Sequence, residues 1–285
     1  MFVSRRKKFL SRLIFLVVGF GFAAFAAFTY NYGARKAYAE YRLKDDAVQW
    51  LRNSGYSEKE YLPTIIGIAH KESRFWDGAV GRHHEVGTMQ LSEALAQEYG
   101  LKISPSLRSS SFAKLFSIHP NERDIDIDRR FDEKTSMQVA IDHFMKVRAR
   151  YQEKYSIDES RARDLAILAF EYGDKRTEDL IEETHSTELA TLLGALTDPS
   201  RPKESWFDRA VAVSFCDHVL NFRKNYEERL PGVLERNAPN VSEIFSYVLS
   251  TPEEFYTRLF RDIPELHRAM NAHSRGGVVG TNSQD

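Results

Sequence analysis

The sequence predicts an all-α protein, with a helical domain behind a single N-terminal membrane helix. Most apolar residues recur at the three- and four-residue spacing of helices, and few stretches alternate as β-strands do. Residues 13–34 contain no charged side chain and would extend about 33 Å as a helix, which is enough to cross a bilayer core. The chain of 285 residues leaves room for one large domain after this helix.

Basic residues on the two sides of the apolar segment predict its orientation. Five precede it and two follow it directly: Arg5, Arg6, Lys7, Lys8 and Arg12, then Arg35 and Lys36. By the positive-inside rule the N-terminus is cytoplasmic and the rest is exported, which in a bacterium gives a single-pass inner-membrane protein with a periplasmic main domain. A cleaved signal peptide is the alternative, but the A-x-A tripeptides fall inside the apolar run (24–26) or far past it (37–39), so we favour an uncleaved anchor.

Charge and cysteine content exclude several classes of function. The chain has 40 Lys and Arg against 41 Asp and Glu, without the basic surplus of a nucleic-acid-binding protein. Its one cysteine, Cys216, excludes an intramolecular disulfide and a cysteine metal cluster, and its apolar surroundings predict a buried thiol. The consecutive residues His83, His84 and Glu85 point in different directions, so we expect a solvated loop there and no metal site.

Helical patterns divide the chain into three expected parts. These are a basic tail and anchor at 1–36, a main domain at 37–230, and a C-terminal helical extension with a disordered tail at 231–285. Helices are expected at 35–50, 62–73, 88–99, 134–151, 161–172, 186–196 and 206–230, with shorter ones at 241–250, 252–260 and 264–273. Residues 101–130 are polar and irregular, and their charge run ERDIDIDRR predicts a solvated loop.

Glu72 is the residue whose position indicates chemistry. Leu62, Ile65, Ile66 and Ala69 form an apolar stripe on one helix, and Glu72 continues it three residues after Ala69. Burial disfavours a charged carboxylate, and so does the negative end of the helix dipole. We therefore expect a raised pKa and a carboxyl that is protonated near neutral pH, as a general acid requires.

Four segments, in order, resemble the lytic transglycosylases with an SLT domain, a family related to goose-type lysozyme. Glu72-Ser73-Arg74-Phe75 resembles the E-S-x-F motif, and Ala79-Val80 with Gly87–Leu91 (GTMQL) resembles A-V-S…G-L-M-Q-L. Residues 132–144 track the D-P-x-x-N-I-x-x-G-x-x-Y-L helix, and Ala169–Gly173 (AFEYG) stands where the family has A-Y-N-A-G. The resemblance covers roughly residues 45–228 and implies a lysozyme-like fold.

The resemblance also implies roles for individual residues. Glu72 would protonate the MurNAc–GlcNAc bond of peptidoglycan and then, as a base, take the proton of the muramyl 6-hydroxyl, which closes a 1,6-anhydro ring. No cofactor or metal is needed. The residues expected to bind substrate are Ser73, Phe75, Gly87, Met89, Gln90, Glu171 and Tyr172. The chain departs from the family at Phe170, which lacks the tyrosine hydroxyl, and at Glu171, which puts a second carboxylate in place of an amide.

These departures keep two other functions open. One is a hydrolytic lysozyme with the same acid, in which Glu85 or Glu171 would activate a water molecule. The other is a non-catalytic peptidoglycan-binding or envelope-scaffold module that keeps the groove. In each case the expected partners are glycan strands and the membrane, with no nucleic acid, and the helices after Pro231 are a candidate surface for another envelope protein.

Overall fold

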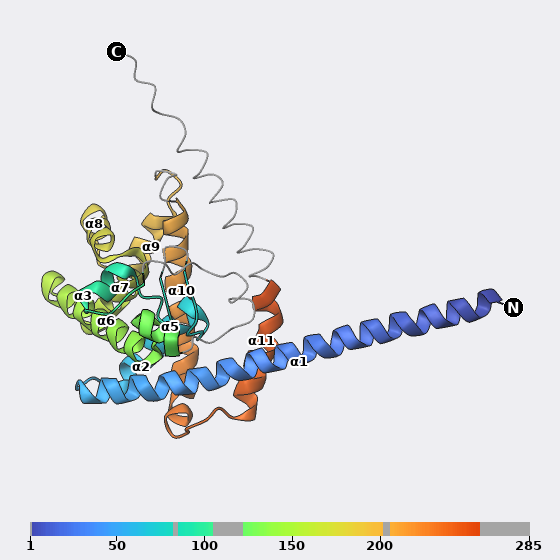
Figure 1. Cartoon of the computed structure of the whole chain (residues 1–285). Coiled ribbons are helices and arrows are strands. Elements are labelled where there is room, and N and C mark those ends of the chain that lie inside the picture. The colour runs from blue at the N-terminus through green and yellow to red at the C-terminus, as the bar shows by residue number, and fades with distance from the viewer. Residues whose placement is uncertain (1, 82–84, 105–121, 202–205, 257–285) are drawn as a thin grey trace, which may run out of the picture. The chain divides into compact units, whose positions relative to one another are not determined.

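The computed structural model describes residues 2–81, 85–104, 122–201 and 206–256 (Figure 1). The regular secondary structure of these residues is helical, which confirms the expected fold class, and they contain no strand beyond two isolated β-bridges, Val80–Val86 and Val86–Leu91. The chain separates into two compact units, one of residues 1–38 and 238–285 and one of residues 39–237. The expected division at residues 36 and 230 stays a prediction.

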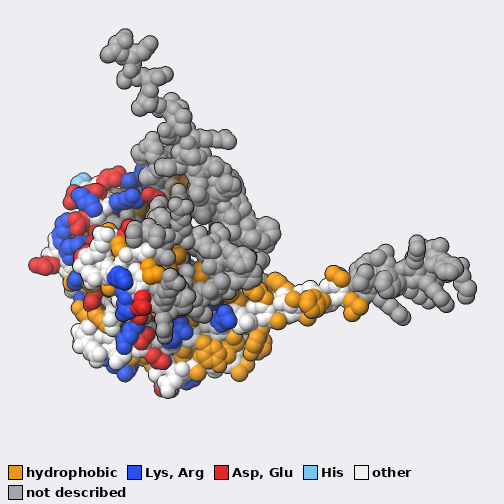
Figure 2. Space-filling view, in the orientation of Figure 1, with side chains coloured by type: hydrophobic (Ala, Val, Ile, Leu, Met, Phe, Trp, Pro, Cys, Tyr) orange, Lys and Arg blue, Asp and Glu red, His pale blue; other side chains and the backbone are white. Residues whose placement is uncertain are grey.

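The first unit contains the apolar part of α1 (Phe2–Asn53) and α11 (Val241–Tyr256). From Leu16 onward α1 is long and apolar enough, by length and composition, to include a membrane span. Its large apolar side chains are exposed, for example Leu16 by 70% and Phe20 by 78%, and Figure 2 shows this apolar surface along the helix. α11 continues through Pro252, where we had expected a new helix, and residues 257–273 lie outside the described part of the chain.

The second unit is built around α2 (Glu58–Ser73), which packs on the long α10 (Trp206–Leu234). Gly67 allows the close approach, because a Cβ there would lie 3.3 Å from the Phe222 ring. α7 (Glu159–Tyr172) contacts α10 and α6 (Glu133–Tyr155), and the last turns of α1 add buried side chains such as Leu43 and Leu51. The apolar stripe of α2 is fully buried, and so is Cys216, as expected.

The remaining elements differ from the helices that the hydrophobic pattern predicts. α8 (Asp174–Thr184) was not expected, and α9 (Leu189–Thr197) begins three residues later than predicted. α3 is only Glu93–Glu98, because Leu91 pairs with Val86 and the Ser92 side chain accepts the Leu95 N–H as the helix cap. Part of the expected loop at 101–130 forms α5 (Glu122–Ile127) and the 3₁₀ turn η1 (Arg129–Phe131).

Candidate active site

Glu72 lies in the last turn of α2, directly before an abrupt end of the helix. Arg74 and Phe75 both adopt left-handed backbone conformations, with φ of 59° and 63°, which are strained for residues with a side chain. The Arg74 N–H closes the turn by donating to the His70 carbonyl at 3.0 Å. The chain therefore reverses immediately after the carboxyl group, and the position of Glu72 is fixed by the turn.

Two residues expected to bind substrate, Ser73 and Phe75, support this turn from inside. The Ser73 hydroxyl donates to the Ala69 carbonyl (3.2 Å) and accepts the Trp76 N–H (3.1 Å), and the residue is buried. Phe75 is only 3% exposed and packs against the His70 ring at 5.1 Å between centroids. Both side chains hold the helix end in place and present almost no surface to a ligand.

The carboxylates of Glu72, Glu85 and Glu171 lie close enough together to influence one another's charge. The pKa of Glu72 is raised well above its usual value, first by burial, then by the charges of Glu171 and Glu85, with Lys71 opposing. Burial also raises the pKa of Glu171 to about 7, with Glu85 adding to the effect and Lys71 acting against it. The apolar stripe predicts a protonated Glu72, and the two acidic neighbours favour the protonated form further.

Lys71 is the positive charge that accompanies these acids. Its ammonium group lowers the pKa of both Glu72 and Glu171. It also donates to the Ser214 hydroxyl of α10 at 3.0 Å, which ties the end of α2 to α10. Nothing in the sequence distinguishes Lys71, since a lysine beside an expected catalytic acid is equally typical of a solvated helix end.

Residues 79–81 and 85–91 are joined by backbone hydrogen bonds into a tight, hairpin-like arrangement that carries Glu85 and Gln90. Val86 and Leu91 exchange backbone hydrogen bonds of 3.1 and 3.0 Å, and the Gly81 N–H donates to the Glu85 carbonyl at 2.6 Å. The Gln90 amide donates to the carbonyls of Ala79 (3.1 Å) and Gly87 (2.7 Å), so it braces the loop from within. Met89 is fully buried and presents no surface to a sugar.

Gly87 is the position in this loop that requires glycine. Its φ is +84°, and a Cβ there would clash with the Arg130 backbone carbonyl. Substitution would therefore strain the backbone and push the loop away from η1. The adjacent residues 82–84, including the expected solvated His83 and His84, lie outside the described part of the chain.

The solvated loop expected for ERDIDIDRR is wrong at its end, because Asp128 and Arg130 form a buried ion pair. Asp128 is 0% and Arg130 1% exposed. The guanidinium donates to both carboxylate oxygens, at 3.0 and 2.7 Å, and to the Leu91 carbonyl at 3.2 Å. Asp128 also accepts the backbone N–H of Ser104 at 3.1 Å. The pair therefore holds the loop that carries Gln90 in place through the Leu91 carbonyl.

The end of α7 directs three consecutive side chains to different neighbours. Phe170 stacks on Phe215 of α10, with centroids 6.2 Å apart, so the residue that lacks the family hydroxyl is part of the helix packing. Glu171 faces the acidic cluster, and Tyr172 is half-buried with the Arg176 guanidinium 5.6 Å over its ring. Of the predicted substrate-binding residues, Gln90, Glu171 and Tyr172 retain exposed surface near Glu72 or on the neighbouring elements.

A stacked histidine pair lies behind the end of α2. The rings of His70 and His218 are 5.0 Å apart, nearly parallel, and one ring nitrogen of each forms a 2.9 Å hydrogen bond. Burial lowers the pKa of His218 to about 4, and the positive charges of Arg74 and Lys71 contribute. His218 is therefore uncharged at neutral pH, and the pair joins α2 to α10 next to Glu72.

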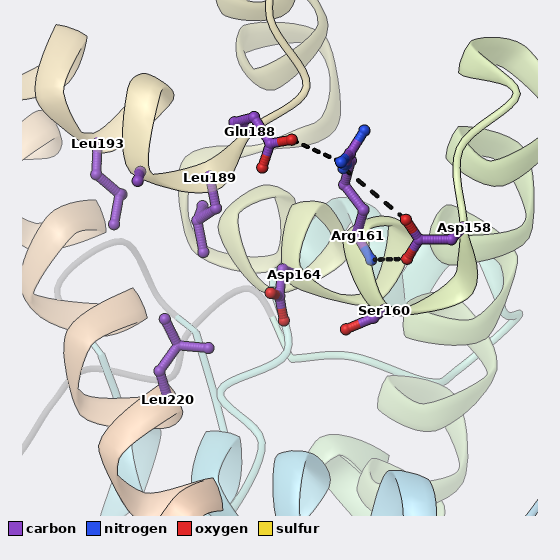
Figure 3. Close-up of a pocket in the computed structure, with 9 residues that line it drawn as sticks. Asp158, Ser160, Arg161, Asp164, Glu188, Leu189, Leu193 and Leu220 are labelled. Atoms are coloured by element: carbon purple, nitrogen blue, oxygen red, sulfur yellow. Dashed lines mark hydrogen bonds and ion pairs between the residues drawn. The ribbon is translucent and has the colours of Figure 1, made fainter.

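A separate pocket of about 460 Å³ lies at the other end of α7, among the start of that helix, α9 and α10 (Figure 3). Leucines line its floor, and Arg161 pairs with both Asp158 and Glu188 at its rim. Asp164 is paired with Arg223 at 2.7 Å. The pocket contains none of the residues predicted from the sequence, and its carboxylates are neutralised by these arginines.

Comparison with protein-family models matches residues 51–192 to the transglycosylase SLT domain. No curated protein and no solved structure gives a significant match. The matched residues include Glu72, the Gly87–Leu91 loop, the Asp128–Arg130 pair and Glu171, and the family is typically one of lytic transglycosylases acting on peptidoglycan. The chain thus carries, over residues 51–192, a domain that belongs to the transglycosylase SLT family.

Proposed function

We propose that this protein is a membrane-anchored peptidoglycan lytic transglycosylase that cleaves the MurNAc–GlcNAc bond and leaves 1,6-anhydro-MurNAc ends. The observation that carries the proposal is Glu72, a carboxyl group with a strongly raised pKa, fixed at a helix end within an SLT domain. The SLT domain supports peptidoglycan as the substrate.

One carboxyl group suffices for both steps of this reaction. Protonated Glu72 donates its proton to the glycosidic oxygen, the bond to the muramyl C1 breaks, and the N-acetyl group of the sugar supports the cation. Ionised Glu72 then removes the proton of the muramyl 6-hydroxyl, whose oxygen bonds to C1. Because burial and the neighbouring acids make the ionised form unfavourable, Glu72 recovers a proton readily and ends in its starting state.

Hydrolysis is the second candidate function, and the raised pKa of Glu171 close to Glu72 is the observation that favours it. With a pKa of about 7, Glu171 is half ionised near neutral pH and is an electrostatic neighbour of Glu72. A carboxylate in that place can accept a proton from water, as the base of an inverting glycosidase does. Glu85 is a second carboxylate in the same group.

The anchor is proposed from α1. Its charge-free stretch from residue 13 to 34, its exposed apolar side chains and the basic residues before it support a single span with the N-terminus in the cytoplasm. The main domain would then face the periplasm, where peptidoglycan lies. Protease digestion of spheroplasts should remove the main domain from outside and leave a membrane-bound fragment, whereas a cleaved signal peptide would release a soluble protein.

The decisive experiment is product analysis. Full-length protein in mild detergent is incubated with purified peptidoglycan, and the released muropeptides are identified by mass spectrometry. We expect anhydro-muramyl ends from the wild type and from Glu182→Gln, which changes an exposed glutamate on α8, and none from Glu72→Gln. Reducing ends would establish hydrolysis instead, and the absence of any released product from the wild type would contradict both enzymatic functions.

A further inference from the structure

We propose that α11 is a second membrane contact, an amphipathic helix whose exposed apolar row rests in the lipid interface beside α1. The proposal rests on the proposed anchor and adds a surface that the anchor alone does not require. It concerns only the unit that contains α11 and residues 1–38.

The contact between α11 and α1 is unusually close. A Cβ on Gly33 would lie 2.5 Å from the Val248 backbone nitrogen and 2.6 Å from its Cα, so the two backbones meet where only glycine fits. Tyr247 and Thr251, one turn apart on α11, are 9% and 2% exposed. Small residues at a backbone-to-backbone crossing are typical of helix pairs inside membranes, where close packing replaces the hydrophobic effect.

The hydroxyl groups near this crossing are satisfied within their own helices. Thr29 donates to the Phe25 carbonyl at 2.8 Å, and Thr251 and Ser250 donate to the Tyr247 carbonyl at 2.7 and 3.0 Å. Hydroxyls bonded in this way need no water, which suits a helix at the edge of a bilayer.

The opposite side of α11 carries an exposed apolar row. Val241, Phe245 and Leu249 are exposed by 69%, 51% and 75%, and their four-residue spacing places them on one face. Residues 244–252 contain no charged side chain; Glu243 precedes them at the helix start, where it accepts the Asn240 N–H at 2.9 Å, and Glu253 and Glu254 follow them. Such a helix suits an interface with apolar chains on one side.

The position at which α11 crosses α1 favours lipid as the partner of the apolar row. Gly33 is in the last turn of the charge-free stretch, and the residues around it resemble the belt at a membrane surface. Phe28 stacks on Tyr32 with centroids 5.9 Å apart, and the Lys36 ammonium lies 4.8 Å from the centre of the Tyr32 ring. α11 therefore meets α1 at the level where aromatic and basic side chains mark the outer bilayer interface.

Spin labels on full-length protein in phosphatidylethanolamine–phosphatidylglycerol vesicles test the proposal. Labels are placed by Phe245→Cys and Leu249→Cys on α11, by Phe22→Cys on α1 as the lipid reference and by Glu182→Cys on α8 as the water reference. Cys216 is buried and stays in place, and the unsubstituted protein gives its labelling background. We expect residues 22, 245 and 249 to collide more with oxygen than with a water-soluble nickel chelate, and residue 182 to show the reverse.

The outcomes separate the two proposals. If residue 22 is in lipid but 245 and 249 are in water, the anchor stands and the role of α11 is overturned. If 245 and 249 are shielded from both relaxants, protein covers them, either a second copy or residues 257–285, and the proposal is also overturned. If residue 22 is itself in water, the anchor fails and the role of α11 fails with it. Gly33→Leu, which blocks the crossing, should shift labels at 245 and 249 toward the nickel chelate while residue 22 stays in lipid.

Discussion

Replacing Glu171 with glutamine should make the protein more stable at high pH while altering the titration of Glu72. The pKa of Glu171 is raised from its usual 4.5 to about 7. Between these values the folded protein keeps a proton that the unfolded chain has released. Stability from this group is therefore complete below pH 4.5 and is lost as the pH rises through 7.

The size of the effect follows from the difference between the two pKa values. A difference of about 2.5 is equivalent to about 3 kcal/mol, at roughly 1.4 kcal/mol for each pKa unit. Glutamine has nearly the same shape but never ionises, so Glu171→Gln should gain up to about 3 kcal/mol relative to the wild type between pH 4.5 and pH 8. Removing this charge also relieves Glu72, whose pKa should fall toward its usual value.

Two assays follow these changes. Urea unfolding of the full-length protein in mild detergent at pH 4.5, 6 and 8 gives the free energy of unfolding for wild type, Glu171→Gln and the exposed control Glu182→Gln. Release of muropeptides as a function of pH should show the alkaline limit of Glu171→Gln moved to lower pH. If the three proteins keep constant differences in unfolding free energy at all pH values, Glu171 carries no ionisation penalty and the reasoning is refuted.

Three further substitutions test the support of the site. Asp128→Asn should destabilise the protein by roughly 3–5 kcal/mol in thermal or urea unfolding, because it leaves the Arg130 guanidinium buried without its charge partner. The control Asp179→Asn, at the exposed pair with Lys175, should change stability by less than about 1 kcal/mol. Equal effects of the two substitutions would contradict a structural role for the buried pair. Gly87→Ala should lower stability by about 2 kcal/mol or more and reduce product release, since it combines a strained φ with a backbone clash, and a variant with wild-type stability and activity would refute this. His218 has an ordinary pKa of 6.5 and a folded pKa of about 4, so the unfolded chain binds the extra proton first as the pH falls. Wild-type stability should therefore fall by up to about 3 kcal/mol between pH 6.5 and pH 4, and that part of the loss should be absent in His218→Phe. An unchanged pH dependence in the variant would count against a neutral, buried His218.

Hydrophobic periodicity along the chain was sufficient to predict the central helices and the position of Glu72. An apolar stripe with a carboxylate at its end is a local pattern, and local spacing determines which face of a helix a residue occupies. The stripe of α2 is indeed buried, and the pKa of Glu72 is raised by that burial. The family resemblance added the GTMQL loop, which lies near enough to place Glu85 within electrostatic range.

Contacts between residues far apart in the sequence could not be predicted from local spacing. Asp128 and Arg130 stand in a run of charges that is typical of a solvated loop, and nothing in the run indicates that Arg130 also reaches the Leu91 carbonyl, 39 positions earlier. At the start of α2, Ser57 and Glu60 have the spacing of a capping box, but the Ser57 side chain makes no capping hydrogen bond. Glu60 instead accepts from Arg163 of α7 at 3.3 Å, since a tertiary partner was available.

The strained turn at Arg74 and Phe75 has a consequence for how a tethered enzyme would meet a polymer. A helix end that reverses through two left-handed residues leaves the acid little room to move, so the substrate must supply the motion. On the proposed function, a polymer strand that must bend toward a stationary carboxyl needs slack. On the proposed function, the rigidity of this single turn would direct cleavage to loosely held strands and spare those under tension.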